Sequence, residues 1–286
     1  MHLLCVCALA PAWLHAADLA IVIDDVGYSL ERGQRVVNLP GQLTLAVLPF
    51  APHTDQLVRQ AVRAGKDVIV HQPMEPQAAT REEEERGTLK LAMQAEEFNS
   101  VLDEALAAVP YRSGLSNHTG SLLTQHREPM ARLMSQLSWR GLYFLDSRTT
   151  AATVALDMAR QMGVPAVRRD VFLDHHRDRR AIHQAFEQAL RVARYQGHAV
   201  LVGHPYPMSL DYLEQRLTDL PADIRLVSAG YLAKRLSRPL WSERAVDRSI
   251  HPFGHPSVDP SSRPAVHQTE PDPQLRPASP HISPAR

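Results

Sequence analysis

The stretch LAIVIDDVGYS (residues 19–29) places two adjacent aspartates, Asp24 and Asp25, at the end of an apolar run. The run is short and rich in β-branched residues, which is typical of a buried β-strand. Two neighbouring carboxylates repel each other, so their position at a strand end needs a physical reason. They either cap the turn that follows the strand or bind a cation that offsets their charge.

Outward from this stretch, apolar runs alternate with helical patterns over residues 18–238. In the helical patterns, apolar residues recur at every third or fourth position. This alternation predicts an α/β fold with a parallel sheet covered on both faces, either a closed (β/α) barrel or an open doubly wound sheet. No glycine-rich phosphate loop follows the first run, which argues against a nucleotide-binding fold. The predicted strands cover residues 19–23, 43–48, 67–70, 141–145, 164–167, 198–202 and 224–227, with a weaker one near residue 115.

The two ends of the 286-residue chain differ from its middle part, residues 18–238, which is expected to form one barrel domain. Residues 1–17 contain an apolar stretch followed by small residues, which predicts a secretory signal peptide and a periplasmic protein. No Lys or Arg precedes that stretch, so a misplaced start or an uncleaved tail are the alternatives. The stretch is too short to span a bilayer, and no transmembrane span is expected in the mature protein. Residues 239–286 are rich in Pro, Ser, Arg and His and are expected to form a disordered tail.

Composition narrows the chemistry that the mature protein can carry out. Both cysteines, Cys5 and Cys7, lie in the predicted signal peptide, so disulfides and thiolate metal ligands are excluded once it is removed. The 31 basic residues equal the 31 acidic ones, which argues against binding of nucleic acid through bulk charge. Any metal site must therefore use His, Asp, Glu or Asn.

Polar side chains follow the predicted strands at the point where each strand ends. The carboxyl ends of parallel strands meet at one rim of a barrel, where enzymes of this architecture keep their active sites. We therefore expect these side chains to lie together although they are far apart in the sequence. The residues concerned are Asp24, Asp25, His71, Asn117, His118, Asp146, Asp170 and His204.

An aspartate and two histidines are suitable ligands for a divalent metal such as Zn²⁺ when no cysteine is present. Asp25, His71 and His118 would make such a set and leave one position open for water. Asp24 beside the metal could then take the proton from that water. A lone histidine after a strand is also common as a structural residue, so the hypothesis depends on several such residues meeting at one rim.

Four residues near the predicted strand ends have two interpretations each. Glu75 in PMEP either binds a loop amide or supports a histidine. Asp146 either orients a ligand or caps the SRTT turn that follows it. Arg169 and Asp170 form either part of the site or an internal ion pair.

Seven motifs occur in this order along residues 18–236: LAIVIDDVGYS, LAVLPFAPHT, VIVHQPMEP, SNHTGSLLT, YFLDSRTT, RRDVFLDH and AVLVGHPYP. Together they resemble the divergent polysaccharide deacetylase family, the envelope proteins often called YibQ-like. That family is distantly similar to the NodB-type carbohydrate esterases, whose fold is a deformed (β/α)7 barrel. The resemblance therefore implies this barrel for residues 18–238.

The resemblance also implies roles for individual residues. Asp24 would be the general base and Asp25 a metal ligand, because the first strand of NodB-type enzymes ends in such a pair. His71 matches the leading histidine of the second motif, and His204 resembles the late histidine that acts as general acid. The implied cofactor is a divalent metal, with Zn²⁺ expected, and the implied partner is an acetylated polysaccharide or cell-wall glycan.

The sequence departs from the NodB pattern at Glu75, where those enzymes carry a second metal-binding histidine. The nearest substitute is His118, next to Asn117 in the NH-x-GS motif, and the arginine-proline and Asp-Trp motifs are missing in their usual form. Two functions follow. The first is hydrolysis of N- or O-acetyl groups on a glycan, with Glu75, Asn117, Asp146 and Asp170 as supporting residues. The alternative is a catalytically inactive barrel that binds envelope glycan or a protein partner.

Overall fold

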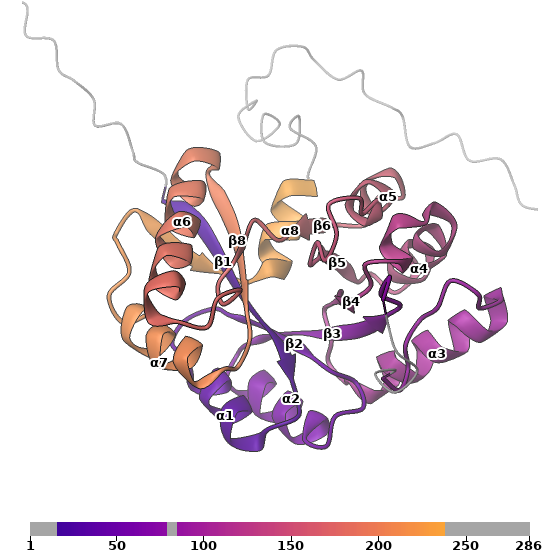
Figure 1. Cartoon of the computed structure of the whole chain (residues 1–286), viewed down its shortest axis with the longest axis horizontal. Coiled ribbons are helices and arrows are strands. Elements are labelled where there is room, and N and C mark those ends of the chain that lie inside the picture. The colour runs from indigo at the N-terminus through magenta and orange to yellow at the C-terminus, as the bar shows by residue number, and fades with distance from the viewer. Residues whose placement is uncertain (1–15, 79–84, 238–286) are drawn as a thin grey trace, which may run out of the picture. The chain divides into compact units, whose positions relative to one another are not determined.

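The computed structural model describes residues 16–78 and 85–237 (Figure 1). The predicted tail lies outside the described residues, and so does the predicted signal peptide apart from Ala16 and Ala17. Strands and helices alternate along most of the described chain, as the sequence pattern predicts. None of these helices combines the length and the apolar character that a membrane span requires.

The described residues form one nine-stranded sheet and the helices that cover it. The strands are β1 (Ala17–Val26), β2 (Thr44–Val47), β3 (Asp67–Met74), β4 (Gly114–Thr119), β5 (Tyr143–Asp146), β6 (Ala166–Arg168), β7 (Val171–Phe172), β8 (His198–Gly203) and β9 (Ile224–Val227). The helices are α1 (Leu30–Asn38), α2 (Thr54–Arg63), α3 (Ala95–Ala108), α4 (Arg127–Trp139), α5 (Ala155–Gln161), α6 (Arg179–Gln196), α7 (Pro207–Arg216) and α8 (Ala229–Ser237), with a short 3₁₀ helix at Leu123–Gln125.

The sheet is parallel throughout and runs in the order β6-β5-β4-β3-β2-β1-β8-β7, with β9 also paired to β1. It curls into a half-barrel with helices around its outside (Figure 1). The predicted α/β fold with a barrel-like parallel sheet is therefore confirmed. The helices α1 and α8, of nine residues each, and the two-residue strand β7 were not predicted.

The two end strands of this order, β6 and β7, are consecutive in the sequence. Only Arg169 and Asp170 lie between them, and we call this pair the seam. The amide of Arg169 donates to the carbonyl oxygen of Asp146 on the β5 side, at 2.9 Å. The amide of Asp170 donates to the carbonyl oxygen of Val200 on β8, also at 2.9 Å. The chain thus crosses from one edge of the half-barrel to the other within two residues.

Two apolar clusters lie on the two faces of the sheet, one on the outside of the half-barrel and one on its inside. In the larger cluster, alternate strand residues such as Ile21 pack against helix residues such as Leu57. The smaller cluster contains the other strand residues, Ala20 and Val22 among them, together with Leu232 of α8 and its neighbours. Because strand side chains alternate between faces, the smaller cluster is the interior of the half-barrel.

Helix α8 closes the amino-terminal end of the strands. Its first amide, that of Ala229, donates to Oγ1 of Thr44 at 2.9 Å, and the amide of Gly230 donates to Oδ2 of Asp67 at 3.2 Å. Thr44 and Asp67 are the first residues of β2 and β3. The carboxyl-terminal rim of the strands is therefore the face on which the polar residues of the sequence motifs gather.

Candidate metal centre

The paired aspartates lie in an irregular segment of β1. The register between β1 and β2 shifts between Ile23 and Val26, so that β1 carries an extra residue there. Asp25 has a left-handed backbone with a φ of 56°, a conformation that Asp tolerates better than most residues. Consecutive side chains of a regular strand point to opposite faces, and a bulge of this kind removes that alternation. Both carboxylates therefore approach one neighbour, His71 of β3.

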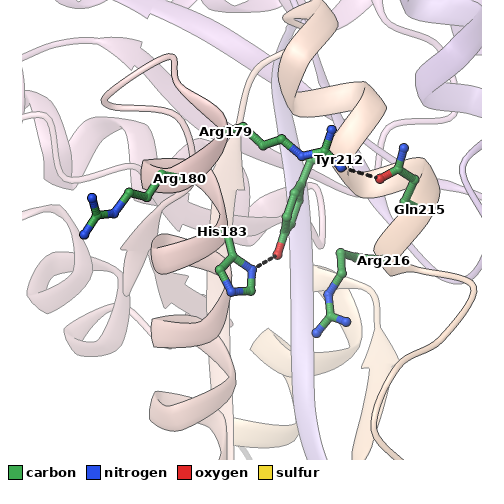
Figure 2. Close-up of a pocket in the computed structure, with 6 residues that line it drawn as sticks. All are labelled: Arg179, Arg180, His183, Tyr212, Gln215 and Arg216. Carbon is green, nitrogen blue, oxygen red and sulfur yellow. Dashed lines mark hydrogen bonds between the residues drawn. The ribbon is translucent and has the colours of Figure 1, made fainter.

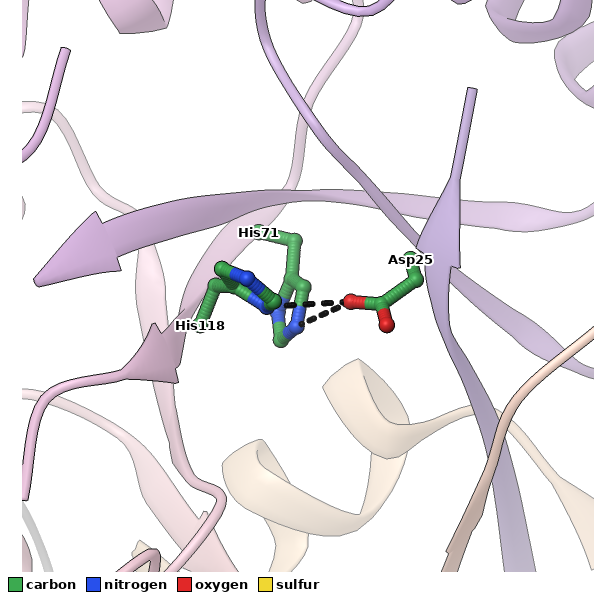
Figure 3. Close-up of side chains that lie close together, drawn as sticks. All are labelled: Asp25, His71 and His118. Atoms are coloured by element: carbon green, nitrogen blue, oxygen red, sulfur yellow. Dashed lines mark ion pairs between the residues drawn. The ribbon is translucent and has the colours of Figure 1, made fainter. Parts of the chain in front are cut away.

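Three ligand-type side chains converge at this point. Nε2 of His71 lies 3.3 Å from Oδ1 of Asp25 and 3.6 Å from Oδ2 of Asp24. Nδ1 of His118 on β4 lies 3.0 Å from the same Oδ1 of Asp25. One ligand atom from each of Asp25, His71 and His118 lies within 4.8 Å of the others (Figure 3).

The donor set and its geometry fit a divalent metal. Oδ1 of Asp25 is buried and has no hydrogen-bond partner among the described residues, although two imidazole nitrogens approach it. A carboxylate oxygen and two imidazole nitrogens that face a common point are a ligand set of the kind found in catalytic zinc sites, which leave one position open. Asp25, His71 and His118 could therefore hold a metal ion.

Outer contacts fix the two imidazole rings. Nδ1 of His71 lies 2.8 Å from the buried Oγ of Ser116, so its Nε2 faces the centre. Nε2 of His118 lies 3.6 Å from Oε2 of Glu85, so its Nδ1 faces the centre. A hydrogen bond to the outer ring nitrogen, such as that between Ser116 and His71, orients a metal-binding histidine and selects its tautomer, whereas the contact of Glu85 with His118 is an ion pair. The sequence did not predict Ser116 or Glu85 as site residues.

The acidic and basic groups of the centre shift each other's pKa values. Burial acts to raise the pKa of Asp25, but contacts with His118 and His71 outweigh it and hold that pKa well below its usual value. Burial acts to lower the pKa of His118, whereas Asp25 and Glu85 raise this pKa to about 10. The carboxylates thus favour a cation at this position, and a metal bound to Nδ1 of His118 would displace a proton from it.

Asp24 is a buried carboxylate beside the ligand set. Its side chain has an Oδ1 without a hydrogen-bond partner among the described residues. Burial raises the pKa of Asp24 above its ordinary value, against the opposing effects of His71 and His204. A raised pKa makes a carboxylate a stronger proton acceptor, which suits a general base.

His204 reaches the same centre from the end of β8. Its Nε2 lies 3.6 Å from Oδ2 of Asp25, and its Nδ1 lies 2.9 Å from Oδ1 of the buried Asp174. Burial acts to lower the pKa of His204, but Asp174 outweighs it and raises that pKa. Asp174 lies in the motif RRDVFLDH, yet the sequence did not predict it as a site residue, because the strand that precedes it is only two residues long.

Two of the predicted supporting residues shape the loops of the rim. Oδ1 of Asn117 accepts a hydrogen bond from the amide of Ser147 at 2.9 Å. Asp146 accepts from the amide of Arg148 at 2.9 Å and from Oγ1 of Thr153 at 3.0 Å, so it caps the turn that follows β5. These contacts join the ends of β4 and β5 and hold the rim in shape.

The other two predicted supporting residues bind backbone amides away from the ligand set. Oε2 of Glu75 accepts from the amide of Leu91 at 2.7 Å, which is the loop-amide reading. Oδ2 of Asp170 accepts from the amide of Val200 at 2.8 Å and so holds the seam to β8. Arg169 does not pair with Asp170; its guanidinium donates to backbone carbonyl oxygens of the loop after β5.

A separate cavity of about 510 Å³ lies between α6 and α7 (Figure 2). In it, Nδ1 of His183 lies 3.0 Å from the hydroxyl of Tyr212, and Arg179 donates to Gln215 at 2.9 Å. The lining consists of Arg179, Arg180, His183, Tyr212, Gln215 and Arg216. This cavity shares no residue with the ligand set, so the metal-binding chemistry lies at the rim.

Comparison with known proteins places this chain in a protein family. Residues 21–233 match the family described as "Divergent polysaccharide deacetylase". The chain is 37% identical over 237 residues to the uncharacterized protein YibQ of Escherichia coli (strain K12), which covers 83% of this chain and 71% of that protein. It is 36% identical over 244 residues to an uncharacterized protein of Haemophilus influenzae, which covers 83% of this chain and 86% of that one.

A solved structure shows the same fold. The crystal structure of uncharacterized protein ATU2773 from Agrobacterium tumefaciens C58 matches with a TM-score of 0.73 and 22% sequence identity. The match covers 76% of this chain and 89% of that one. The family match over residues 21–233 and the relatives above 30% identity lead to one conclusion. The chain belongs to the divergent polysaccharide deacetylase family.

Proposed function

We propose that the protein is a metal-dependent hydrolase that removes N- or O-acetyl groups from a polysaccharide of the cell envelope. The observation that carries the proposal is the convergence of Asp25, His71 and His118 beside the buried Asp24. Membership of the family supports a polysaccharide as the substrate. The sequence of residues 1–17 supports a periplasmic location.

Each residue near the centre has a different role in the proposed reaction. A divalent metal such as Zn²⁺, held by Asp25, His71 and His118, would polarise the acetyl carbonyl and lower the pKa of the attacking water. Asp24, with its raised pKa, accepts the proton of the attacking water. His204, with Nε2 3.6 Å from Asp25, donates a proton to the leaving amine or alcohol. Asp174 holds the imidazole of His204 in place.

Glu75 is the reason to consider a second function. NodB-type enzymes have a metal-binding histidine at the corresponding place, whereas Glu75 here binds the amide of Leu91. A protein of this fold that binds envelope glycan or a protein partner without chemistry would keep the half-barrel and release no acetate. The two functions differ in one measurable quantity, the release of acetate.

The test uses the purified, zinc-loaded protein and acetylated glycans of defined structure. We expect Asp25→Ala to remove both zinc and acetate release, because it deletes a ligand. We expect Asp24→Asn to keep zinc but to lower kcat by about 10² or more, since a general base contributes on that order. Asp55→Ala, at an exposed aspartate of α2, is the matched control and should leave both quantities unchanged.

Two outcomes would contradict the proposal. Full acetate release after replacement of both Asp25 and His71 would show that the reaction does not use this centre. Saturable binding of cell-wall glycan by the zinc-loaded wild type, without acetate release from any acetylated glycan, would favour the non-catalytic function.

A further inference from the structure

A small cavity adjoins the candidate metal centre. It has a volume of about 150 Å³ and lies between the turn after β1 and the turn after β8. Its lining includes the metal-ligand candidate Asp25, the aromatic residues Tyr28 and Tyr206, and Arg32. A chemical group that enters this cavity therefore comes into contact with the centre itself.

Both aromatic walls are held by other residues of the rim. The ring of Tyr206 stacks on His204 with 5.2 Å between centroids, and its hydroxyl accepts from Arg177 at 2.7 Å. The hydroxyl of Tyr28, which is 55% exposed, donates to Glu85 at 3.2 Å. The guanidinium of Arg177 also lies over the Tyr206 ring, 3.8 Å from its centroid, so the exposed ring of Tyr28 is the one that offers an apolar face beside a hydroxyl, as a sugar ring requires.

Arg32 brings to this cavity a positive charge that has no ion-pair partner among the described residues. It is the third residue of α1, and no hydrogen bond or ion pair joins its guanidinium to another described side chain. Arg35, one turn later on the same helix, binds Asp211 at 2.6 Å and Glu214 at 2.9 Å. Asp211 and Glu214 of α7 thus pair with Arg35. The guanidinium of Arg32 is therefore available to bind a negatively charged group of a ligand.

The lining of the cavity has one acidic residue, Asp25, and that carboxylate belongs to the metal-ligand set. A guanidinium matches a carboxylate in charge and in planar, two-pronged geometry. We propose that the cavity binds a sugar unit that carries a carboxylate, with Arg32 on the carboxylate and the acetyl group at the metal centre. This inference rests on the proposed deacetylase function and names its substrate class, an acidic glycan.

The test compares matched pairs of oligosaccharides with the zinc-loaded protein. One pair is N-acetylated and one is O-acetylated, and each consists of a carboxylated form and the same oligomer with its carboxylate reduced to an alcohol. We expect wild-type kcat/KM to be about tenfold or more higher for the carboxylated form, because hydrogen bonds between charged groups contribute on that order. The preference should shrink at high salt, which screens exposed charges.

Variants assign the preference to one residue. Arg32→Gln should lose the preference, so that its kcat/KM for the carboxylated form falls to the value that it has for the reduced form. Arg32→Lys should keep part of it, since the charge remains but the two-pronged geometry is lost. Arg63→Gln removes the same charge from an exposed residue at the end of α2, which lines a different cavity, and should behave as wild type. Equal thermal stability of the variants shows that they fold.

The outcomes separate this inference from the proposed function. Equal wild-type rates on both forms, or a preference that survives in Arg32→Gln, would overturn the role of Arg32 and leave the deacetylase function standing. If neither form releases acetate, the proposed function fails, and calorimetric titration with the same pairs tests the cavity. Tighter binding of the carboxylated form by wild type, lost in Arg32→Gln, supports the site; equal binding refutes it.

Discussion

Asp174 is the residue on which the position of His204 depends. Its Oδ1 lies 2.9 Å from Nδ1 of His204, and its Oδ2 accepts from the backbone amide of His204 at 2.7 Å. Oδ2 also accepts from Oγ of Ser209 at 2.7 Å. Asp174 touches neither the ligand set nor the cavity beside it, so it is a positioning residue that directs Nε2 of His204 towards Asp25.

We predict that Asp174→Asn lowers kcat for acetate release by about 10- to 100-fold, the usual effect of losing an orienting contact of this type. KM and zinc content should stay unchanged, because the substitution leaves the ligand set intact. Steady-state kinetics and metal analysis measure these quantities. Ser209→Ala is the matched control, since it removes one contact of Asp174 and keeps the contact with His204. An equal loss of kcat in both variants would point to a merely structural role.

Much of the centre could be predicted residue by residue. Asp25, His71 and His118 stand at predicted strand ends, and their residue types indicate metal binding. Asp174 could not be found in this way, because β7 is too short to be recognised as a strand. Glu85 could not be found either, because it lies in the charged run REEEERG, which is typical of a solvated surface.

At the scale of elements, the end of β1 depends on Gly27, two residues after Asp25. Its φ is 141°, and a Cβ at this position would lie 2.6 Å from Cβ of Ala51. Gly65, at the end of α2, also has a positive φ, 70°, but a Cβ there would meet no atom within 4 Å. A side chain at Gly65 would therefore meet backbone strain alone, whereas a side chain at Gly27 would meet both backbone strain and a steric clash.

We predict that Gly27→Ala lowers the free energy of unfolding by about 2–4 kcal/mol, because strain and overpacking add. Gly65→Ala should cost only about 1 kcal/mol, the cost of a left-handed backbone for alanine. Urea denaturation measures both. Zinc affinity should fall in Gly27→Ala alone, since the shifted turn displaces Asp25; equal losses of stability would rule out the contact with Ala51.

The alternation of strand side chains explains which polar residues meet. His71 lies two residues after Ile69, and Asp24 two after Val22, and both Ile69 and Val22 belong to the inner cluster. Asp146 lies two residues after Phe144, which belongs to the outer cluster, so it faces the helices. This sorting can be done from the sequence once the inner face is known. The irregularity that turns Asp25 inward cannot, because it depends on the pairing of β1 with β2.

At the scale of the whole molecule, the seam connects the two edges of the half-barrel through backbone and not through a pair of strands. Arg169 is bonded to the end of β5, and Asp170 to β8. Asp174, which positions His204, follows only four residues after Asp170. The spacing of the seam therefore determines how the β8 side of the centre is placed.

We predict that insertion of Gly-Ser between Arg169 and Asp170 lowers the free energy of unfolding by about 2 kcal/mol, because at least two backbone hydrogen bonds are lost. Acetate release should fall more than zinc content. The same insertion between Thr218 and Asp219, in an exposed loop, should cost less than about 1 kcal/mol. Denaturation and kinetics on both proteins check this, and equal effects would show that the seam has no special role.

The position of helix α8 limits the side from which a ligand can reach the centre. It covers the amino-terminal ends of β2 and β3, and Leu232 and Ala233 pack into the interior. In the proposed reaction, the glycan and the acetate would therefore reach and leave the centre on the side of the opposite rim, where a cavity adjoins Asp25. If the proposed deacetylation takes place there, acetate formed at the centre would have to leave past the bound glycan, so product release would be coupled to movement of the polymer.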